Sequence, residues 1–160
     1  MTSSTVDRRL VEAADPAATS ALGRALGAVA RPGDLVCLWG ELGAGKTHLA
    51  KAFAVGLGVT ETVTSPSFIL MAEYRGRLPL FHIDPYRLAS AEDALAGGLI
   101  DERQREGVTL VEWPERLGDA LPAARLDVRI DGTGDDRRSI TLVAGSDDYR
   151  RYLDAAAVAA

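Results

Sequence analysis

The chain has 160 residues, close to the usual size of one globular domain; 47% of them are hydrophobic and 26% are charged. That balance is too apolar for a disordered chain, and the chain is long enough to bury a hydrophobic core without help from disulfides or bound metals. The formal net charge of −5 argues against a general binder of nucleic-acid phosphates. The single cysteine, Cys37, excludes an internal disulfide and a cysteine-based metal cluster. We expect one domain over residues 1–160.

The N-terminus carries scattered charges and no apolar run, so it does not resemble a signal peptide. No stretch approaches the ~20 apolar residues that span a bilayer. With an unpaired thiol and no export signal, we expect a cytoplasmic protein with no membrane attachment.

The first part of the chain alternates between strand and helix patterns. Residues 4–11 alternate in polarity and predict a short edge strand, and residues 17–30 carry apolar side chains at helical spacing. The continuous apolar run 35–39 predicts a strand that is covered on both faces. After a glycine-rich turn, residues 46–57 predict an amphipathic helix.

The second part is richer in strand patterns. Two hairpins and one more buried strand are predicted by the segments 67–74 with 78–84, 125–131 with 137–143, and 108–111. A helix start is expected at residues 90–93, and the alanine-rich tail from Asp154 indicates a frayed helix or disorder.

Residues 40–47, GELGAGKT, fit the pattern G-x-x-x-x-G-K-[ST] at every fixed position. Glycines let such a loop curl until successive N–H groups point at phosphate oxygens, and the following helix N-terminus adds partial positive charge. The lysine can reach the β- and γ-phosphates, and the threonine hydroxyl can ligate Mg²⁺. The alternative is a glycine-rich turn with an incidental lysine, but the apolar strand before the loop and the helix after it favour phosphate binding. The predicted nucleotide contacts here are Gly40, Gly43, Ala44, Gly45, Lys46, Thr47 and His48.

These patterns together predict an α/β protein with a small P-loop NTPase fold. We expect a central mixed sheet with a parallel core and added antiparallel strands, with helices on both faces.

A P-loop needs a second magnesium anchor, a carboxylate at the end of a neighbouring strand. Glu112 ends the apolar run 108–111 and is our candidate for the direct ligand beside Thr47. Asp84 ends a less central-looking segment, and we expect it to act through water, on the metal or on the attacking nucleophile. Either carboxylate could instead cap the turn that follows it.

Three further features have two interpretations each. His82 alternates with Asp84 on one strand face, and a single histidine there is more often a hydrogen-bonded core residue than a catalyst. The loop with Ser65 and Ser67 is either an ordinary turn or a switch that senses the γ-phosphate. Trp113 is either a core aromatic or a platform for nucleotide or partner.

Four motifs, GELGAGKT at 40–47, TSPSF at 64–68, HIDPYRL at 82–88 and VEWPERL at 111–117, occur in the order and spacing of one family. Over roughly residues 15–117 the chain resembles the TsaE (YjeE) family, small bacterial ATPases required for threonylcarbamoyladenosine in tRNA.

The resemblance implies an ATP-hydrolysing accessory that works with the transferase subunits TsaB and TsaD and meets tRNA only through that complex. It assigns phosphate and magnesium binding to Lys46 and Thr47, and completion of the metal site to Glu112. By the same resemblance, Asp84 is the family's functionally important aspartate, and Ser65 and Ser67 belong to its switch loop.

Three positions depart from the family pattern. His48 stands where a second threonine is usual, which removes a hydroxyl but leaves the backbone N–H. Ser67 replaces threonine in the Ser-Pro-Thr loop, and Pro85 replaces an apolar residue after Asp84 and should stiffen the chain there.

Two other classes remain open from the sequence. A small-molecule kinase would use the same loop together with an arginine-rich lid, for which Arg103 and Arg105 are the mid-chain candidates. A nucleotide-responsive binding protein would bind ATP with negligible hydrolysis.

Overall fold

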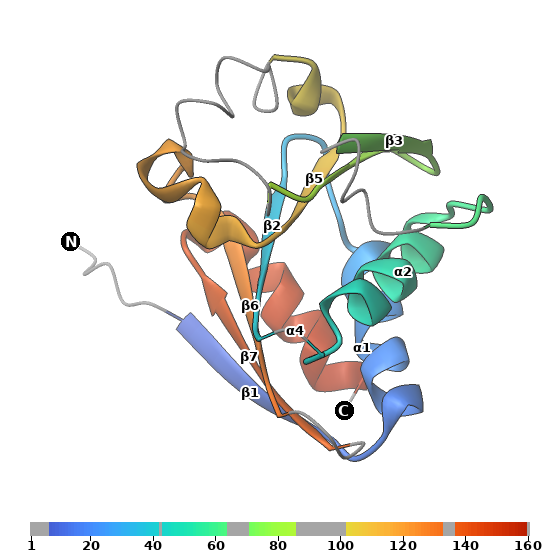
Figure 1. Cartoon of the computed structure of the whole chain (residues 1–160), viewed down its shortest axis with the longest axis vertical. Helices are drawn as coiled ribbons and strands as arrows, with labels where there is room; N and C mark the ends of the chain where they lie inside the picture. The colour runs from blue at the N-terminus through green and yellow to red at the C-terminus, as the bar shows by residue number, and fades with distance from the viewer. Residues whose placement is uncertain (1–6, 42, 64–70, 86–101, 133–136, 160) are drawn as a thin grey trace.

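The computed structural model describes residues 7–41, 43–63, 71–85, 102–132 and 137–159 (Figure 1). Its described strands form one mixed, seven-stranded sheet in the order β1-β7-β6-β2-β5-β4-β3. They are β1 (Asp7–Ala13), β2 (Leu35–Trp39), β3 (Met71–Arg75), β4 (Pro79–Ile83), β5 (Val108–Glu112), β6 (Leu126–Asp131) and β7 (Arg138–Ala144). The described helices are α1 (Pro16–Ala28), α2 (Lys46–Leu57) and α4 (Arg150–Ala159), with 3-10 helices η1 (Glu102–Glu106), η2 (Pro114–Arg116), η3 (Gly118–Ala120) and η4 (Asp147–Tyr149).

Four neighbouring strands, β6, β2, β5 and β4, are parallel and form the centre of the sheet. The strands β7, β1 and β3 join them in antiparallel pairs at the two sides. Every residue of β5 is buried, and so are the first four of β2, because both faces of these strands are covered. Since the carboxyl ends of parallel strands meet at one sheet edge, the loop after β2 lies beside the ends of β5 and β4.

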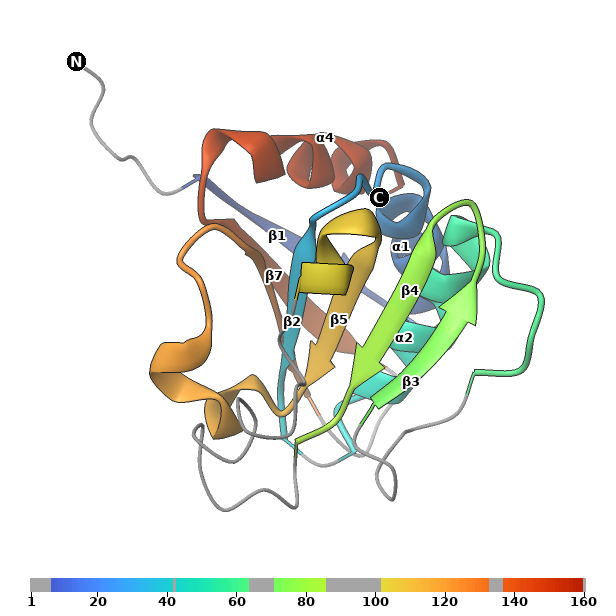
Figure 2. The same cartoon turned by 90° about the horizontal axis from the view of Figure 1, so that it is seen from above.

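All three described α-helices pack on one face of the sheet (Figure 2). Their buried side chains share one apolar cluster with inward-facing residues of the strands, such as Val36 and Leu38 of β2. The opposite face is covered over β2, β5 and β4 by the segment of η2 and η3, where Leu117 packs on Cys37 and Val111. No α-helix within the described ranges combines the length and apolarity needed to cross a membrane.

The two helices next to the glycine-rich loop approach each other through glycine. A Cβ added at Gly27 on α1 would stand 2.1 Å from the Phe53 carbonyl oxygen, and one at Gly56 on α2 would stand 2.1 Å from that of Arg24. The backbones of α1 and α2 are thus in contact, and no side chain fits at either glycine. This contact fixes α2, whose first turn belongs to the candidate site.

The C-terminal helix α4 is anchored by a buried polar cluster. Asp34, in the turn before β2, accepts hydrogen bonds from the Tyr152 hydroxyl at 2.5 Å, from the backbone N–H of Arg31 at 2.9 Å, and from the Arg151 guanidinium. Burial, and then the charge of Asp34, raises the pKa of Tyr152 above its ordinary value. The alanine-rich tail is therefore a packed helix in the structure, beginning at Arg150.

The predicted elements agree closely with the observed ones where the chain is described. The strand 35–39 and the helix 46–57 have the predicted bounds, and both hairpins form antiparallel pairs. Pro79 is tolerated in an interior strand because it is the first residue of β4. The mixed sheet with a parallel core is confirmed, and of the helices expected on both faces the described α-helices lie on one face and the 3-10 helices η2 and η3 on the other. The expected helix start at 90–93 lies outside the described residues.

Candidate functional site

The glycine-rich loop between β2 and α2 is tightly curled. Gly43 and Gly45 have φ values of 85° and 105°, in the left-handed region that a side chain disfavours. The N–H of Ala44 donates to the Glu41 carbonyl at 3.0 Å, and the first bond of the helix runs from Leu49 N–H to Gly45 C=O at 2.9 Å. The N–H groups of residues 46–48 therefore stand in the first turn, where the helix itself offers them no carbonyl.

Arg138 on β7 holds the loop from outside. Its Nε donates to the Ala44 carbonyl at 2.9 Å, and its Nη2 donates to the Gly43 carbonyl at 3.4 Å. In a trans peptide the C=O and the following N–H point in opposite directions, so these contacts turn the N–H groups of Ala44 and Gly45 away from Arg138. Nothing in the local sequence pattern predicted this residue, because it comes from a strand some 90 positions later.

Lys46 is buried, with 6% of its surface exposed, and its ammonium faces inward. Nζ donates to the Gly40 carbonyl at 2.5 Å and lies 3.2 Å from the centroid of the Trp113 ring, a cation–π contact. Burial lowers the pKa of Lys46, while the carboxylates of Glu115, Glu112 and Asp84 act in the opposite direction. Glu115 was not among the residues selected from the sequence, and of the three carboxylates it has the largest effect on the pKa of Lys46.

Thr47, Glu112 and His82 form a chain of contacts behind the loop. The Thr47 hydroxyl donates to Glu112 Oε1 at 3.0 Å, and His82 Nε2 lies 2.6 Å from Glu112 Oε2. His82 and Glu112 are both almost fully buried. The two residues predicted to hold magnesium therefore lie together, and they supply a hydroxyl and a carboxylate, the oxygen donors that Mg²⁺ favours.

Asp84 lies one strand further along the same edge. Because Ile83 pairs with Val111, Asp84, the residue after β4, is level with Glu112 at the end of β5, and it is 3% exposed. Its negative charge reaches Lys46, so the structure brings both candidate carboxylates to the loop.

Trp113 directly follows Glu112 and has the one positive φ, 54°, among the non-glycine residues that the structure describes. Such a conformation is strained for a bulky side chain, and strain of this kind is concentrated at functional sites. The turn brings the indole over Lys46, which places Trp113 at the site and not in the core.

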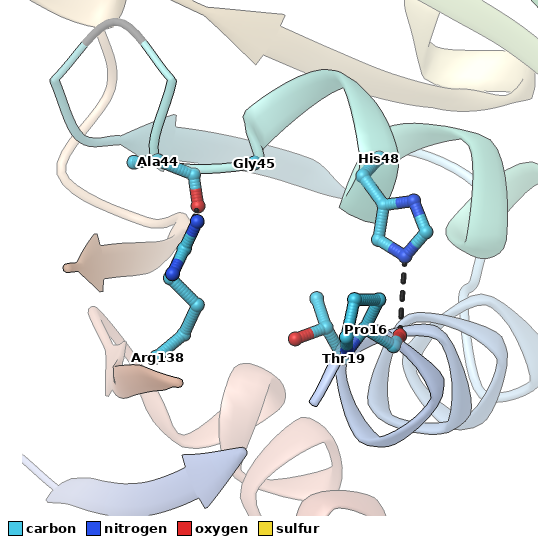
Figure 3. A pocket seen from close by; sticks show the side chains of 6 residues that line it. All are labelled: Pro16, Thr19, Ala44, Gly45, His48 and Arg138. Carbon is cyan, nitrogen blue, oxygen red and sulfur yellow. Dashed lines mark hydrogen bonds between the residues drawn. The ribbon is translucent and has the colours of Figure 1, made fainter. Parts of the chain in front are cut away.

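A pocket of about 170 Å³ opens beside the loop on the α1 side (Figure 3). Figure 3 shows Arg138 and His48 on opposite sides of it. His48 Nε2 lies 3.1 Å from the Pro16 carbonyl and 2.9 Å from the Ser20 hydroxyl, so it joins α2 to the start of α1. Since a carbonyl can only accept, this nitrogen carries the hydrogen. The lining residues are Pro16, Thr19, Ala44, Gly45, His48 and Arg138.

Four further residues were selected from the sequence. Ser65 and Ser67 lie outside the described residues. Arg103 and Arg105 belong to η1, which precedes β5 and so sits at the opposite edge of the sheet from Glu112.

Comparison with known proteins gives the class of the protein and then its family. The crystal structure of YdiB from Bacillus subtilis matches this chain with a TM-score of 0.78 and 36% sequence identity, over 97% of each chain. The chain therefore has a P-loop α/β fold. The family model described as threonylcarbamoyl adenosine biosynthesis protein TsaE matches residues 13–140.

Individual relatives agree with the family model. The tRNA threonylcarbamoyladenosine biosynthesis protein TsaE of Bacillus subtilis is 43% identical over 141 residues, covering 88% of each chain. The protein of the same name from Treponema pallidum is 41% identical over 124 residues, covering 78% of this chain and 92% of the relative. The chain belongs to the TsaE family, which takes part in the biosynthesis of threonylcarbamoyladenosine in tRNA.

Proposed function

We propose that this protein, as a single P-loop domain over residues 1–160, is a magnesium-dependent ATPase that serves threonylcarbamoyladenosine modification of tRNA. The observation that carries the proposal is the contact between Thr47 and Glu112, at 3.0 Å, directly behind a curled glycine-rich loop. A hydroxyl and a carboxylate at this place are the two protein groups with which a P-loop holds the Mg²⁺ that is bound to a nucleoside triphosphate.

The phosphate chain of ATP would lie along the loop from Gly43 to His48. The N–H groups in the first turn of α2 would bind phosphate oxygens, with help from the positive end of the helix. Lys46 would leave the Gly40 carbonyl and the Trp113 ring and bind the β- and γ-phosphates. This exchange is favourable because burial disfavours the charged ammonium in the free protein, and the negative charge of the phosphates stabilises it in the complex.

Thr47 and Glu112 would hold Mg²⁺, in part through water, because this ion keeps several waters in its shell. When bound, it supplies neutralisation of the charge on the β- and γ-phosphate oxygens. Asp84, which follows β4 at the level of Glu112, would hold a water molecule, either one of the metal's or the one that attacks the γ-phosphate. In this proposal Ser65 and Ser67 keep the role of a switch loop.

The pocket between Arg138 and His48 is our proposed place for the nucleoside. It opens beside Gly45, at the end of the loop that the α-phosphate would reach, and its walls combine an imidazole, a guanidinium and a proline ring. Such groups stack on and hydrogen-bond to a purine and its ribose.

The proposed partners are the transferase subunits TsaB and TsaD, with tRNA reached only through them. The relatives' names place their proteins in this modification, and the net charge of −5 disfavours direct binding of a polyanion.

Two alternatives use the same loop. A small-molecule kinase loses support because its candidate lid arginines lie in η1, at the far edge of the sheet. A nucleotide-responsive binding protein differs only in lacking turnover.

Measurement of phosphate release with and without the partner subunits separates the three. Release that TsaB and TsaD stimulate supports the proposal. Transfer of phosphate to an added acceptor supports the kinase, and nucleotide binding with no release in any mixture supports the binding protein.

A further inference from the structure

His82 is a buried polar residue that the proposed reaction does not yet use. Its side chain has no exposed surface, and it lies on β4 facing the same side of the sheet as Asp84. Burying an imidazole costs free energy that an apolar side chain at this position would not. A specific hydrogen bond must therefore compensate for it, and the bond at 2.6 Å to Glu112 is that contact.

The hydrogen on the ring can be assigned from its two neighbours. Nδ1 is buried and has no hydrogen-bond partner within the described structure. A carboxylate only accepts, so Nε2 must carry the hydrogen that is donated to Glu112 Oε2. This tautomer leaves a lone pair without a partner on Nδ1. The other tautomer would bury an unpaired N–H at Nδ1 and set the lone pair of Nε2 against Glu112 Oε2.

The contact divides the carboxylate of Glu112 between two partners. Oε2 is held by His82 from β4, and Oε1 faces the hydroxyl of Thr47 from α2. His82 pairs in register with Leu110, two residues before Glu112, so the imidazole reaches diagonally across the two strands. Rotation of the Glu112 carboxylate would break the hydrogen bond from His82. That bond therefore fixes the direction in which Oε1 points.

We propose that His82 is a positioning residue for the magnesium site: its Nε2–H holds one oxygen of Glu112 so that the other faces Thr47 and the metal. This inference rests on the proposed function. Groups that hydrogen-bond to metal-binding residues orient them, and their loss typically weakens metal binding by about 10- to 100-fold.

Two amide substitutions separate positioning from packing. In His82→Gln the side-chain amide nitrogen reaches the place of Nε2, whereas in His82→Asn it reaches only the place of Nδ1. Both variants bury one amide, so their effects on folding should be similar. Ile83→Val is the matched control, since Ile83 is a buried neighbour on β4 whose side chain packs on the opposite face of the sheet.

The measurement is the magnesium concentration that half-saturates binding of the ATP analogue AMP-PNP, by calorimetry, together with the affinity in the absence of metal. We expect His82→Asn to raise the half-saturating concentration by about 10- to 100-fold. His82→Gln and Ile83→Val should stay near wild type, and the metal-free affinity should be unchanged in all three. A purely structural role would instead move metal-free and metal-dependent binding together.

Wild-type metal dependence in His82→Asn overturns this inference alone. Absence of magnesium-dependent binding in the wild type overturns the proposed function, and this inference with it. If the variants do not fold, long-range ¹H–¹⁵N spectra of the wild-type imidazole decide, without nucleotide: hydrogen on Nε2 supports the assignment, and hydrogen on Nδ1 contradicts it.

Discussion

Thr47 Oγ1 lies 3.0 Å from Glu112 Oε1, although the two residues are 65 positions apart in the chain. Thr47 is in the first turn of α2, and Glu112 is the last residue of β5. Parallel pairing of β2 with β5 brings them together, since it sets the end of one strand beside the loop that follows the other. The sheet order is thus what makes a pair of oxygen donors out of two distant residues.

We predict that Glu112→Ala weakens magnesium-dependent ATP binding more than Asp84→Ala does. Loss of even an outer hydrogen-bond partner of a metal ligand costs about 10- to 100-fold, so loss of the ligand should cost at least about tenfold. Asp84 follows β4 at the level of Glu112, one strand further from the loop, and we assign it to water. Isothermal titration with and without Mg²⁺ ranks the two variants. The reverse ranking would exchange the roles of the two carboxylates.

We predict that Lys46→Met abolishes tight ATP binding and raises the thermal midpoint of the nucleotide-free protein. Burial lowers the pKa of Lys46, so the unfolded chain holds this proton more firmly than the folded one does. Between the lowered pKa and the ordinary value of 10.5, the contribution of Lys46 to stability therefore rises with pH. Below that window the buried ammonium is a net cost, which methionine removes.

The matched control is Lys51→Met, because Lys51 lies exposed on the same helix. Calorimetry of melting should show no comparable stabilisation in that variant. A lower midpoint for Lys46→Met would mean that the Gly40 and Trp113 contacts outweigh the cost of burial. Retention of wild-type ATP affinity would remove Lys46 from the site.

Cys37 should be chemically silent in the folded protein. Burial, with a smaller effect of Asp127, raises the pKa of its thiol from 9.0 to about 12. The thiol's contribution to stability is complete below pH 9 and is lost as the pH rises toward 12, because the unfolded chain ionises first. At pH 8, labelling with a thiol reagent should follow unfolding in a denaturant titration. Rapid labelling of the native protein would show that β2 opens locally.

The isolated protein should bind tRNA weakly at physiological salt. Affinity for nucleic acids comes largely from neutralised phosphates, and the chain has a net charge of −5. Fluorescence anisotropy of labelled tRNA, with the protein alone and then with the TsaB and TsaD subunits, measures this. A tight complex of protein and tRNA without the subunits would contradict the accessory role.

The strand, loop and helix from Leu35 to Leu57 could be predicted because their signals are local. The apolar run, the glycines and the helical spacing each act within a few residues, and the structure has the predicted bounds. The tail was harder to predict, since an alanine-rich end fits a packed helix as well as a frayed one. Its burial depends on Tyr152 and Arg151 meeting Asp34, more than a hundred positions earlier.

The residues at the site divide in the same way. The loop motif predicted Lys46 and Thr47, and a strand-end carboxylate predicted Glu112. Arg138 and Glu115 could not be found from local patterns, since their approach to the loop depends on the order and register of the strands. His82 was weighed as a core residue first, and its burial agrees, but only the register of β4 with β5 shows that it faces Glu112.

The central claim is that main-chain N–H groups of the loop, with Lys46 and Thr47, surround the phosphates of ATP. Amide ¹H–¹⁵N spectra of the labelled protein, titrated with Mg²⁺ and ATP and separately with adenosine, test it most directly. We expect large shifts of the Gly43, Gly45, Lys46 and Thr47 amide signals with Mg²⁺ and ATP, and small shifts with adenosine. Unchanged loop amides at saturating ATP would contradict it.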